Sequence, residues 1–485
     1  MPLSNRSLRL LGASAVALAI AGCATVGPDF KPAPAPQGAA AAGYAMPGDP
    51  APAGVRMSPE ARGAGPWWQA FGSPELDQAV RQALADSPSV AEAAATLAKA
   101  QAELAAARGD QQPQVDALAN AQRERINTQA FGFSFPGLFN PTISLFQIGA
   151  SVTYDLDLFG GKRRATEAAG ARAQAEGRRA DAAYLALSGN VALQAMRIAA
   201  LRAQIATVQD IIAADTHQID ILRKAQVIGG EARSSLSTAI YQLAEDQALL
   251  PPLQRDLAAA RHQMALLSGR SPADYVATDF DMAKLTLPGE IPVSLPSELI
   301  RRRPDIAAAE AELHAATADI GVAVANQYPN ISLSARLTQG ALKPDKIFDY
   351  ASSGWSLLGG ATAPIFDGGR LKGERRAAEA EARAALARYQ QTVLRAFAQV
   401  SDVLAALASD QQAIASLSAV NHAADVALRD NEASYRLGGG PLINVVQAQR
   451  TVSRARRALV EAQGRRLADM VELYAATATD WRAAP

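Results

Sequence analysis

The chain has 485 residues, and its 47 Lys and Arg residues balance 47 Asp and Glu residues. This balance provides no basic field for binding nucleic acid and no net charge that identifies a partner. The single cysteine, Cys23, excludes disulfides within the chain and cysteine clusters for metal binding.

The first residues have the features of a secretory signal that ends at a cysteine. Asn5–Arg9 is positively charged, Leu10–Ala21 is apolar, and Ile20-Ala21-Gly22-Cys23 resembles a bacterial lipobox. We expect residues 1–22 to be removed and Cys23 to be acylated; an ordinary signal with a chance cysteine is the alternative. Several acyl chains, at about 0.8 kcal/mol per buried methylene, make a stable membrane anchor. Residues 23–66, rich in Pro, Ala and Gly, are expected to form a tether.

The remainder of the chain reads as a tandem duplication. Two prolines 25 residues apart, Pro88 and Pro113, recur as Pro304 and Pro329, and both intervals are alanine-rich helices. The glycine pair Gly229-Gly230 recurs as Gly438-Gly439. The predicted parts are a first repeat at 67–268, a connecting segment at 269–295, a second repeat at 296–478 and a tail at 479–485.

Each repeat contains two stretches of alternating apolar and polar residues. The clearest is residues 146–156, where Phe146, Ile148, Val152 and Tyr154 share one face; the weaker ones are Val115–Ala121, Ile331–Leu337 and Trp355–Ile365. No stretch after the signal has about eighteen uninterrupted apolar residues. We therefore expect any membrane crossing to be by strands, with these four residues facing lipid. A small sheet packed on helices in a soluble domain has the same alternation.

A long helix follows the strands in each repeat, from Gly160 to about Ile228 and from Gly368 to about Leu437. Apolar residues recur every seven positions, as in Val191, Ile198, Ile205, Ile212 and Ile219, which is typical of a coiled coil. The companion stripes include Asp215 and Asp410. Each long helix is about 100 Å long. A returning helix is expected at Ala232–Ser268. A soluble bundle or a spacer stalk is the alternative.

These elements predict a mainly α-helical protein with a membrane β-barrel. Four strands cannot close around a pore, but three protomers supply twelve strands. In the first repeat, the alanine-rich helix after Pro88 and the returning helix Ala232–Ser268, stacked end to end, together match the length of the long helix. With the same arrangement in the second repeat, each protomer has four helical columns. The prediction is a homotrimer with a 12-strand β-barrel above a 12-column α-barrel.

Several motifs resemble the outer-membrane factors of tripartite (RND-type) efflux systems, the TolC-like, NodT-type lipoproteins. The motifs are Val26-Gly27-Pro28-Asp29-Phe30-Lys31-Pro32, residues 67–76, residues 302–310, Ile320-Gly321-Val322-Ala323, Tyr328-Pro329-Asn330-Ile331, Phe366-Asp367-Gly368-Gly369-Arg370 and Tyr435-Arg436-Leu437-Gly438. The chain departs from the family near Asn444, where relatives commonly have an aspartate.

The resemblance implies a trimeric, lipid-anchored channel of the bacterial outer membrane with a long periplasmic extension. Its tips, at Gly229, Gly230, Gly438 and Gly439, would meet a periplasmic adaptor bound to an inner-membrane pump. Ala24, in the place of a retention aspartate, also favours the outer membrane. The resemblance includes no nucleic-acid partner.

Charged residues before the second tip are candidates for a periplasmic gate. Asp425, Arg429, Glu432 and Arg436 follow one side of the helix, and Asp430 and Tyr435 lie among them. The resemblance to closed-tip channels implies that they hold the tip shut. A solvated helix face with weak ion pairs is the alternative.

The sequence shows no catalytic, metal or cofactor site. His217, His262, His314 and His422 are scattered and lack ligand spacing, so each is expected to be solvated or packed. Arg301-Arg302-Arg303 is expected to brace neighbouring helices. The rival functions are a structural coiled-coil tether of the outer membrane and a periplasmic adaptor lipoprotein; an enzyme is not expected.

Overall fold

The computed structural model describes residues 25–34, 44, 46, 48–50, 55–57, 66–125, 142–230, 232–287, 291–293 and 296–478. The expected signal, Cys23, residues 126–141 between the first two predicted strands and the tail at 479–485 lie outside these residues. The chain forms two compact units, and the long helices contribute to both. Unit 1 comprises residues 1–33, 97–176 and 309–389, and unit 2 comprises residues 34–96, 177–308 and 390–485.

The same order of elements occurs twice along the chain. The first copy contains α3 (Pro88–Gly109), β2 (Gln114–Arg125), β3 (Thr142–Leu156), α4 (Gly161–Val227), α5 (Arg233–Gln247) and α6 (Leu250–Leu267). The second contains α8 (Pro304–Ala325), β5 (Asn330–Ala341), β6 (Ser353–Thr362), α9 (Arg370–Arg436) and α10 (Leu442–Thr477). Matching elements have matching lengths: α3 and α8 have 22 residues each, and α4 and α9 have 67 each.

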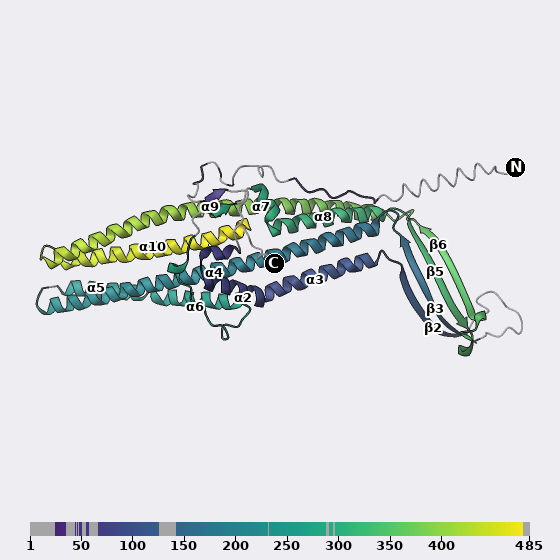
Figure 1. Ribbon diagram of the computed structural model, residues 1–485, viewed down its shortest axis with the longest axis horizontal. Helices are drawn as coiled ribbons and strands as arrows, with labels where there is room; N and C mark the ends of the chain where they lie inside the picture. The colour runs from purple at the N-terminus through teal and green to yellow at the C-terminus, as the bar shows by residue number, and fades with distance from the viewer. Residues whose placement is uncertain are drawn as a thin grey trace. The chain divides into compact units, whose positions relative to one another are not determined.

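Unit 1 contains one antiparallel sheet with strand order β2-β3-β5-β6 (Figure 1). All four predicted strands are present. Three of them are longer than the alternation indicated, and β3 reaches 15 residues. Two short 3₁₀ turns, η4 (Pro344–Lys346) and η5 (Tyr350–Ser352), connect β5 to β6.

Unit 2 is built from two helix pairs, α4 with α5 and α6, and α9 with α10. The heptad prediction is confirmed where the stripes are buried, at Val191 and Ile198 in α4 and at Val393 and Val400 in α9. Near the tips, Ile219 and Leu222 of α4 pack with Leu442 and Val445 of α10. In each pair, the long helix thus supplies the buried stripe against which the returning helices pack.

The returning helix of the first copy differs from its prediction. The expected helix Ala232–Ser268 is broken into α5 and α6, because Pro251 and Pro252 lie in the first turn of α6. A proline has no N–H to donate and clashes with the preceding turn, so an unbroken helix cannot pass through this position. In the second copy, α10 runs unbroken through 36 residues.

Short elements surround the helix pairs of unit 2. They are β1 (Val55–Met57), the 3₁₀ turn η1 (Trp67–Phe71), α2 (Pro74–Asp86), the 3₁₀ turn η3 (Met282–Lys284), β4 (Ile291–Val293) and α7 (Pro296–Arg302). β1 and β4 pair in parallel and so join the tether to the connecting segment. Trp67 stacks on Tyr474 at 5.6 Å between ring centroids.

Arg303 follows α7 and braces the end of α10. Its guanidinium donates to the carbonyl oxygen of Ala476 at 2.8 Å and pairs with Asp305. A cation at the last carbonyls of a helix is favourable. The bracing interpretation is therefore confirmed for this arginine.

Among the described residues, one helix passes a length and composition test for a membrane span. It is α9, which contains an 18-residue stretch apolar enough for a membrane span, whereas the sequence predicted no such helix. The same test is passed by core helices of soluble proteins. In α9, the buried residues Val393, Val400 and Leu407 follow the coiled-coil stripe.

Candidate functional site

The sheet of unit 1 has one apolar and one polar face. In an antiparallel pair, directly opposed residues project to the same side. Val152 of β3 opposes Val115 of β2 and Ala335 of β5. The register thus collects these residues on one face: Val115, Ala117, Ala119, Ala121, Phe146, Ile148, Ala150, Val152, Tyr154, Leu156, Ile331, Leu333, Ala335, Leu337, Gln339, Ala341, Ser353, Trp355, Leu357, Gly359 and Ala361.

The apolar face is uncovered in the described part of the protomer. Trp355 is 81% exposed, Leu357 74% and Val115 69%. The opposite face carries mainly polar residues: Asp116, Asn120, Gln122, Gln147, Ser151, Thr153, Asp155, Ser332, Ser334, Arg336, Thr338 and Ser356. An exposed apolar surface of this extent marks contact with another protein or with lipid.

Both edges of this sheet are free in the described protomer. β2, with 12 residues, forms one edge and β6, with 10 residues, forms the other. Each edge presents a row of backbone N–H and C=O groups that can pair with another strand. The sheet therefore has room for one further strand on each side.

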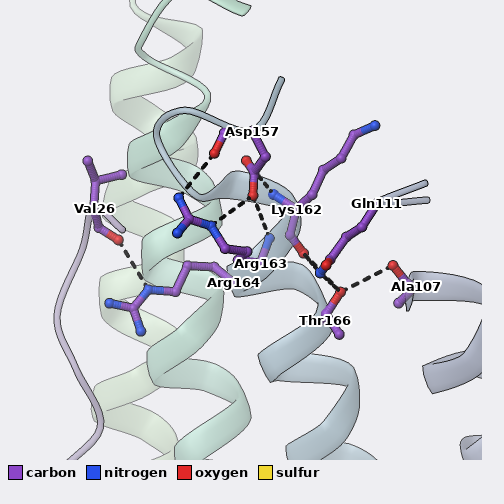
Figure 2. A network of polar contacts seen from close by, with 8 residues as sticks. All are labelled: Val26, Ala107, Gln111, Asp157, Lys162, Arg163, Arg164 and Thr166. Carbon is purple, nitrogen blue, oxygen red and sulfur yellow. Dashed lines mark hydrogen bonds and ion pairs between the residues drawn. The ribbon is translucent and has the colours of Figure 1, made fainter. Parts of the chain in front are cut away.

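The N-terminal segment, residues 25–34, is bound to the start of α4. Arg164, with its side chain only 4% exposed, donates to the carbonyl oxygen of Val26 at 3.2 Å (Figure 2). It also donates to Asp29 at 2.7 Å. It also pairs with Glu167 at 2.7 Å. A buried guanidinium with several acceptors fixes the segment strongly, because leaving any of them unpaired is costly.

Glu167 extends this contact to α8. Its carboxylate is 2.9 Å from Nε2 of His314, and the His314 ring stacks on Phe30 with centroids 4.3 Å apart. Desolvation raises the pKa of Glu167, but hydrogen bonds from His314 and Arg164 outweigh it and hold the pKa below its ordinary value. His314 is thus a packed histidine, as expected.

Aspartates cap both long helices at their first residues. Asp157 accepts from the backbone N–H groups of Lys162 and Arg163 (Figure 2), and Asp367 accepts from those of Gly369 and Leu371. These backbone donors lower the pKa of Asp367. The caps satisfy orphan N–H groups and suit the positive end of the helix dipole.

A second network ties the end of α3 to α4. Thr166 donates to the carbonyl oxygen of Ala107 at 3.1 Å, and Gln111 donates to the Thr166 hydroxyl at 2.6 Å (Figure 2). The start of α4 is thereby fixed from two sides.

Both predicted tips are glycine turns at the ends of the long helices. Gly229 and Gly438 have φ of 76° and 75°, a left-handed conformation that favours glycine. The N–H of Gly230 donates to Ala225, and that of Gly439 donates to Ser434, which completes the same cap in each copy. Val227, Ile228 and Leu437 beside the turns are more than 80% exposed.

The six gate candidates have different surroundings in the protomer. Asp425 accepts from Arg456 of α10 at 3.0 Å and from Asn421 at 3.3 Å. Tyr435 is partly buried against the cluster around Leu442. The remaining four are exposed: Arg429, Asp430, Glu432 and Arg436.

Two features were missed by the sequence analysis. The first is the clamp of the N-terminal segment by Arg164, Glu167 and His314, because it joins three segments that lie far apart in the chain: residues 25–34, the start of α4 and α8. The second is two carboxyl contacts, between the buried Asp215 and Asp246 and between the buried Asp410 and the partly buried Asp469. Asp215 and Asp410 occupy positions in apolar stripes, and this was the one sign in the sequence that these acids would be buried.

The family model for outer membrane efflux proteins matches residues 79–270 and 295–479 of the chain. Over 423 residues the chain is 32% identical to the pyoverdine export outer membrane protein OpmQ of Pseudomonas putida KT2440, covering 86% of this chain and 88% of that protein. It is 29% identical over 416 residues to nodulation protein T of Rhizobium leguminosarum bv. viciae, covering 84% and 83%.

A solved structure has the same fold along most of the chain. The outer-membrane channel OprN superposes with a TM-score of 0.83 and 26% identity, over 94% of this chain and 100% of that one.

Proposed function

The chain belongs to the outer membrane efflux protein family, and we propose that it is the exit duct of a tripartite efflux pump. In this function it passes small molecules from a periplasmic adaptor and an inner-membrane transporter to the outside.

The sheet supports closure into a membrane barrel by three copies of the chain. Within lipid, no backbone group on an open edge can find water, so the edges β2 and β6 must pair. Three four-stranded sheets supply twelve strands, an even number in the range of bacterial barrels. The apolar face with Phe146, Ile148, Val152 and Tyr154 then faces lipid, and the polar face lines the pore.

The helix pairs support a tube of twelve helical columns. Stripe residues Ile205 and Ile212 of α4 and Ile414 of α9 are only half-buried in the protomer. Helices of neighbouring protomers would bury them further, which is the usual role of a sustained heptad stripe. The proposed division remains a first repeat at 67–268, a connecting segment at 269–295 and a second repeat at 296–478.

The clamp on residues 25–34 supports a lipid anchor at Cys23. Thr25 packs closely against Gly160. A Cβ atom added to Gly160 would come within 2.6 Å of the Thr25 side chain. Because Gly160 follows β3 closely, Thr25 lies beside the end of that strand, and Cys23 precedes Thr25 by two positions in the sequence. Acyl chains on Cys23 would then enter the same membrane as the strands.

The tips support a contact with the adaptor. Val227, Ile228 and Leu437 expose apolar side chains around the turns at Gly229, Gly230, Gly438 and Gly439. The gate candidates Asp425, Arg429, Asp430, Glu432, Tyr435 and Arg436 lie in the last turns of α9 before the second turn. We assign them to closing the tip until an adaptor engages.

The observation that carries this function is the uncovered apolar face on a sheet with two free edges. A coiled-coil tether needs no such sheet, and an adaptor has one helical hairpin where this chain has two. Neither rival explains the register of β2, β3, β5 and β6.

The test is to place arginine on the two faces of β3. Val152→Arg together with Ile148→Arg should cost about 2–4 kcal/mol per site near mid-bilayer and should sharply reduce the yield of heat-stable trimers. Thr153→Arg is the matched control, because Thr153 lies on the polar face opposite Gln114 and Ser334. A normal trimer yield from the double variant would contradict a membrane-spanning strand.

A further inference from the structure

Two buried carboxyl groups meet in the seam between α4 and α5. Asp215 is 8% exposed and Asp246 is 4% exposed, and their carboxyl groups are within hydrogen-bond reach of each other. Gln242 donates to Oδ2 of Asp246 at 2.6 Å. Two ionised carboxylates cannot share such a contact, since neither has a hydrogen to donate.

A small cavity adjoins this pair. Its volume is about 10 Å³, close to the room that one water molecule needs. Four buried polar atoms of its lining have no hydrogen-bond partner among the described residues: Oδ2 of Asp215, Nε2 of Gln218, Oε1 of Gln242 and Nε of Arg450. Two of these atoms accept and two donate, which matches the two donors and two acceptors of a single water molecule.

The charges that face the pair come from three helices. Arg450 of α10 faces Asp215 and is also paired with Glu245 of α5 at 3.4 Å. The pKa of Asp215 is raised to about 7, mainly by burial and then by the neighbouring Asp246, while Arg450 opposes the shift.

A second pair lies between α9 and α10. Asp410 is 7% exposed, and its Oδ2 atom is buried with no hydrogen-bond partner in the described part of the chain. Its Oδ1 atom lies 3.9 Å from Arg465, and its carboxyl group is in hydrogen-bond contact with that of the partly buried Asp469. The pKa of Asp469 is raised to about 7, mainly by burial and then by Asp410 and Glu472, while Arg465 opposes the shift.

We propose that each helix pair of unit 2 contains a proton-binding site: Asp215 and Asp246 share one proton beside one buried water, and Asp410 and Asp469 share another. The proton makes one carboxyl a donor and so completes the hydrogen bonds of the seam. Its release places two like charges in a buried contact and weakens the packing of α4 on α5 and of α9 on α10. This proposal does not depend on the proposed export function.

The sign of the effect follows from proton linkage. The folded pairs hold a proton at a pH where the unfolded chain has released it. Stability contributed by the helix pairs is therefore highest at low pH and falls as pH rises toward and through about 7. Above that pH the repulsion is fully present.

The test uses the full-length protein in detergent and the infrared absorption of protonated carboxyl groups. We expect the wild-type protein to show this absorption at about pH 6 and to lose most of it by about pH 8. Asp215→Asn and Asp469→Asn should each remove part of the titrating absorption, and the double variant should remove nearly all of it. Asn preserves the shape and supplies a donor, so the variants should fold.

Asp220→Asn is the matched control. Asp220 is an exposed acid on α4 whose pKa is lowered by its hydrogen bond with Lys224, so its change should leave the titration intact. The proposal is overturned if the wild-type protein shows no absorption from protonated carboxyls at about pH 6. It is also overturned if the Asn double variant titrates like the wild-type protein.

Discussion

The two helix pairs of unit 2 share one framework but differ in the polar groups of their seams. α4 and α9 have equal lengths and equivalent glycine turns, so Gly229 corresponds to Gly438 at an offset of 209 residues. At the same offset, Asp215 corresponds to Ala424, and Asp410 corresponds to Leu201. Ala424 and Leu201 are both buried.

Each buried carboxylate thus has an apolar counterpart in the other copy. The seam does not require an acid at either position, because the other copy closes with an apolar residue there. A buried like-charge pair is costly unless a proton or a partner compensates it. The comparison indicates that the coiled coil can close without an acid at either position. The two acids also lie at different levels along their helix pairs.

The largest expected effect comes from giving the first copy the residue of the second. Asp215→Ala should raise the thermal midpoint at about pH 8 and make it less dependent on pH. The pKa of Asp215 lies at about 7 rather than 3.8, which corresponds to a cost on the order of 4 kcal/mol when the pair is forced to ionise. At about pH 5, where the pair is protonated, the gain should be small.

Asp210→Ala, an exposed change on the same helix, is the control for that comparison. If Asp215→Ala lowered the midpoint equally at both pH values, Asp215 would stabilise the seam independently of pH and would not be part of a proton-binding site. The two seams would then differ only in packing.

The next effect concerns the break that only the first copy has. Val460 of α10 corresponds to Pro251 at the same offset. Val460→Pro should destabilise the second helix pair by about 3 kcal/mol, because α10 would lose a backbone hydrogen bond and gain a clash. The thermal midpoint of the purified protein measures this. Pro251→Ala should change the midpoint much less; equal effects of the two changes would show that the break is not a real difference between the copies.

The sequence predicted the long helices and the strands because their periods are local and extend over many residues. The heptads of α4 and α9 and the alternation of β3 each repeat often enough to exclude other types of secondary structure for these segments. The prediction of one helix at Ala232–Ser268 took no account of Pro251 and Pro252, which break it into α5 and α6. β1, with three residues, is too short to show a period.

The side-chain contacts were beyond the sequence for a different reason. Arg164 meets Asp29, and Asp215 meets Asp246, only because folding brings separate segments together. Spacing alone marked Asp215 as an acid in an apolar stripe, but it could not identify the residue on the returning helix that faces it. The expected tip glycines, by contrast, follow from a local need for positive φ.

The smallest effect concerns the charges before the second tip, where the copies differ again. Asp425 pairs with Arg456, whereas the corresponding residues of the first copy are Thr216 and Gln247. Arg429 corresponds to Asp220, so the charge at this position is reversed between the copies. If α4 and α9 alternate around a trimer, opposite charges can face each other at the tip. Such exposed pairs contribute about 0.5 kcal/mol each.

Three copies of a pair act together, so Asp425→Ala with Arg429→Ala should shift the ratio of open to closed channels by roughly tenfold. Conductance in planar bilayers measures the open fraction. The matched control is Thr216→Ala with Gln247→Ala in the first copy, which changes the positions that correspond to Asp425 and Arg456 but removes no charge and should have a smaller effect. A double variant of the second copy that forms normal trimers and conducts like the wild-type protein would place these residues on a solvated face. The tip would then have to be closed by the packing of Tyr435 against the cluster around Leu442 instead.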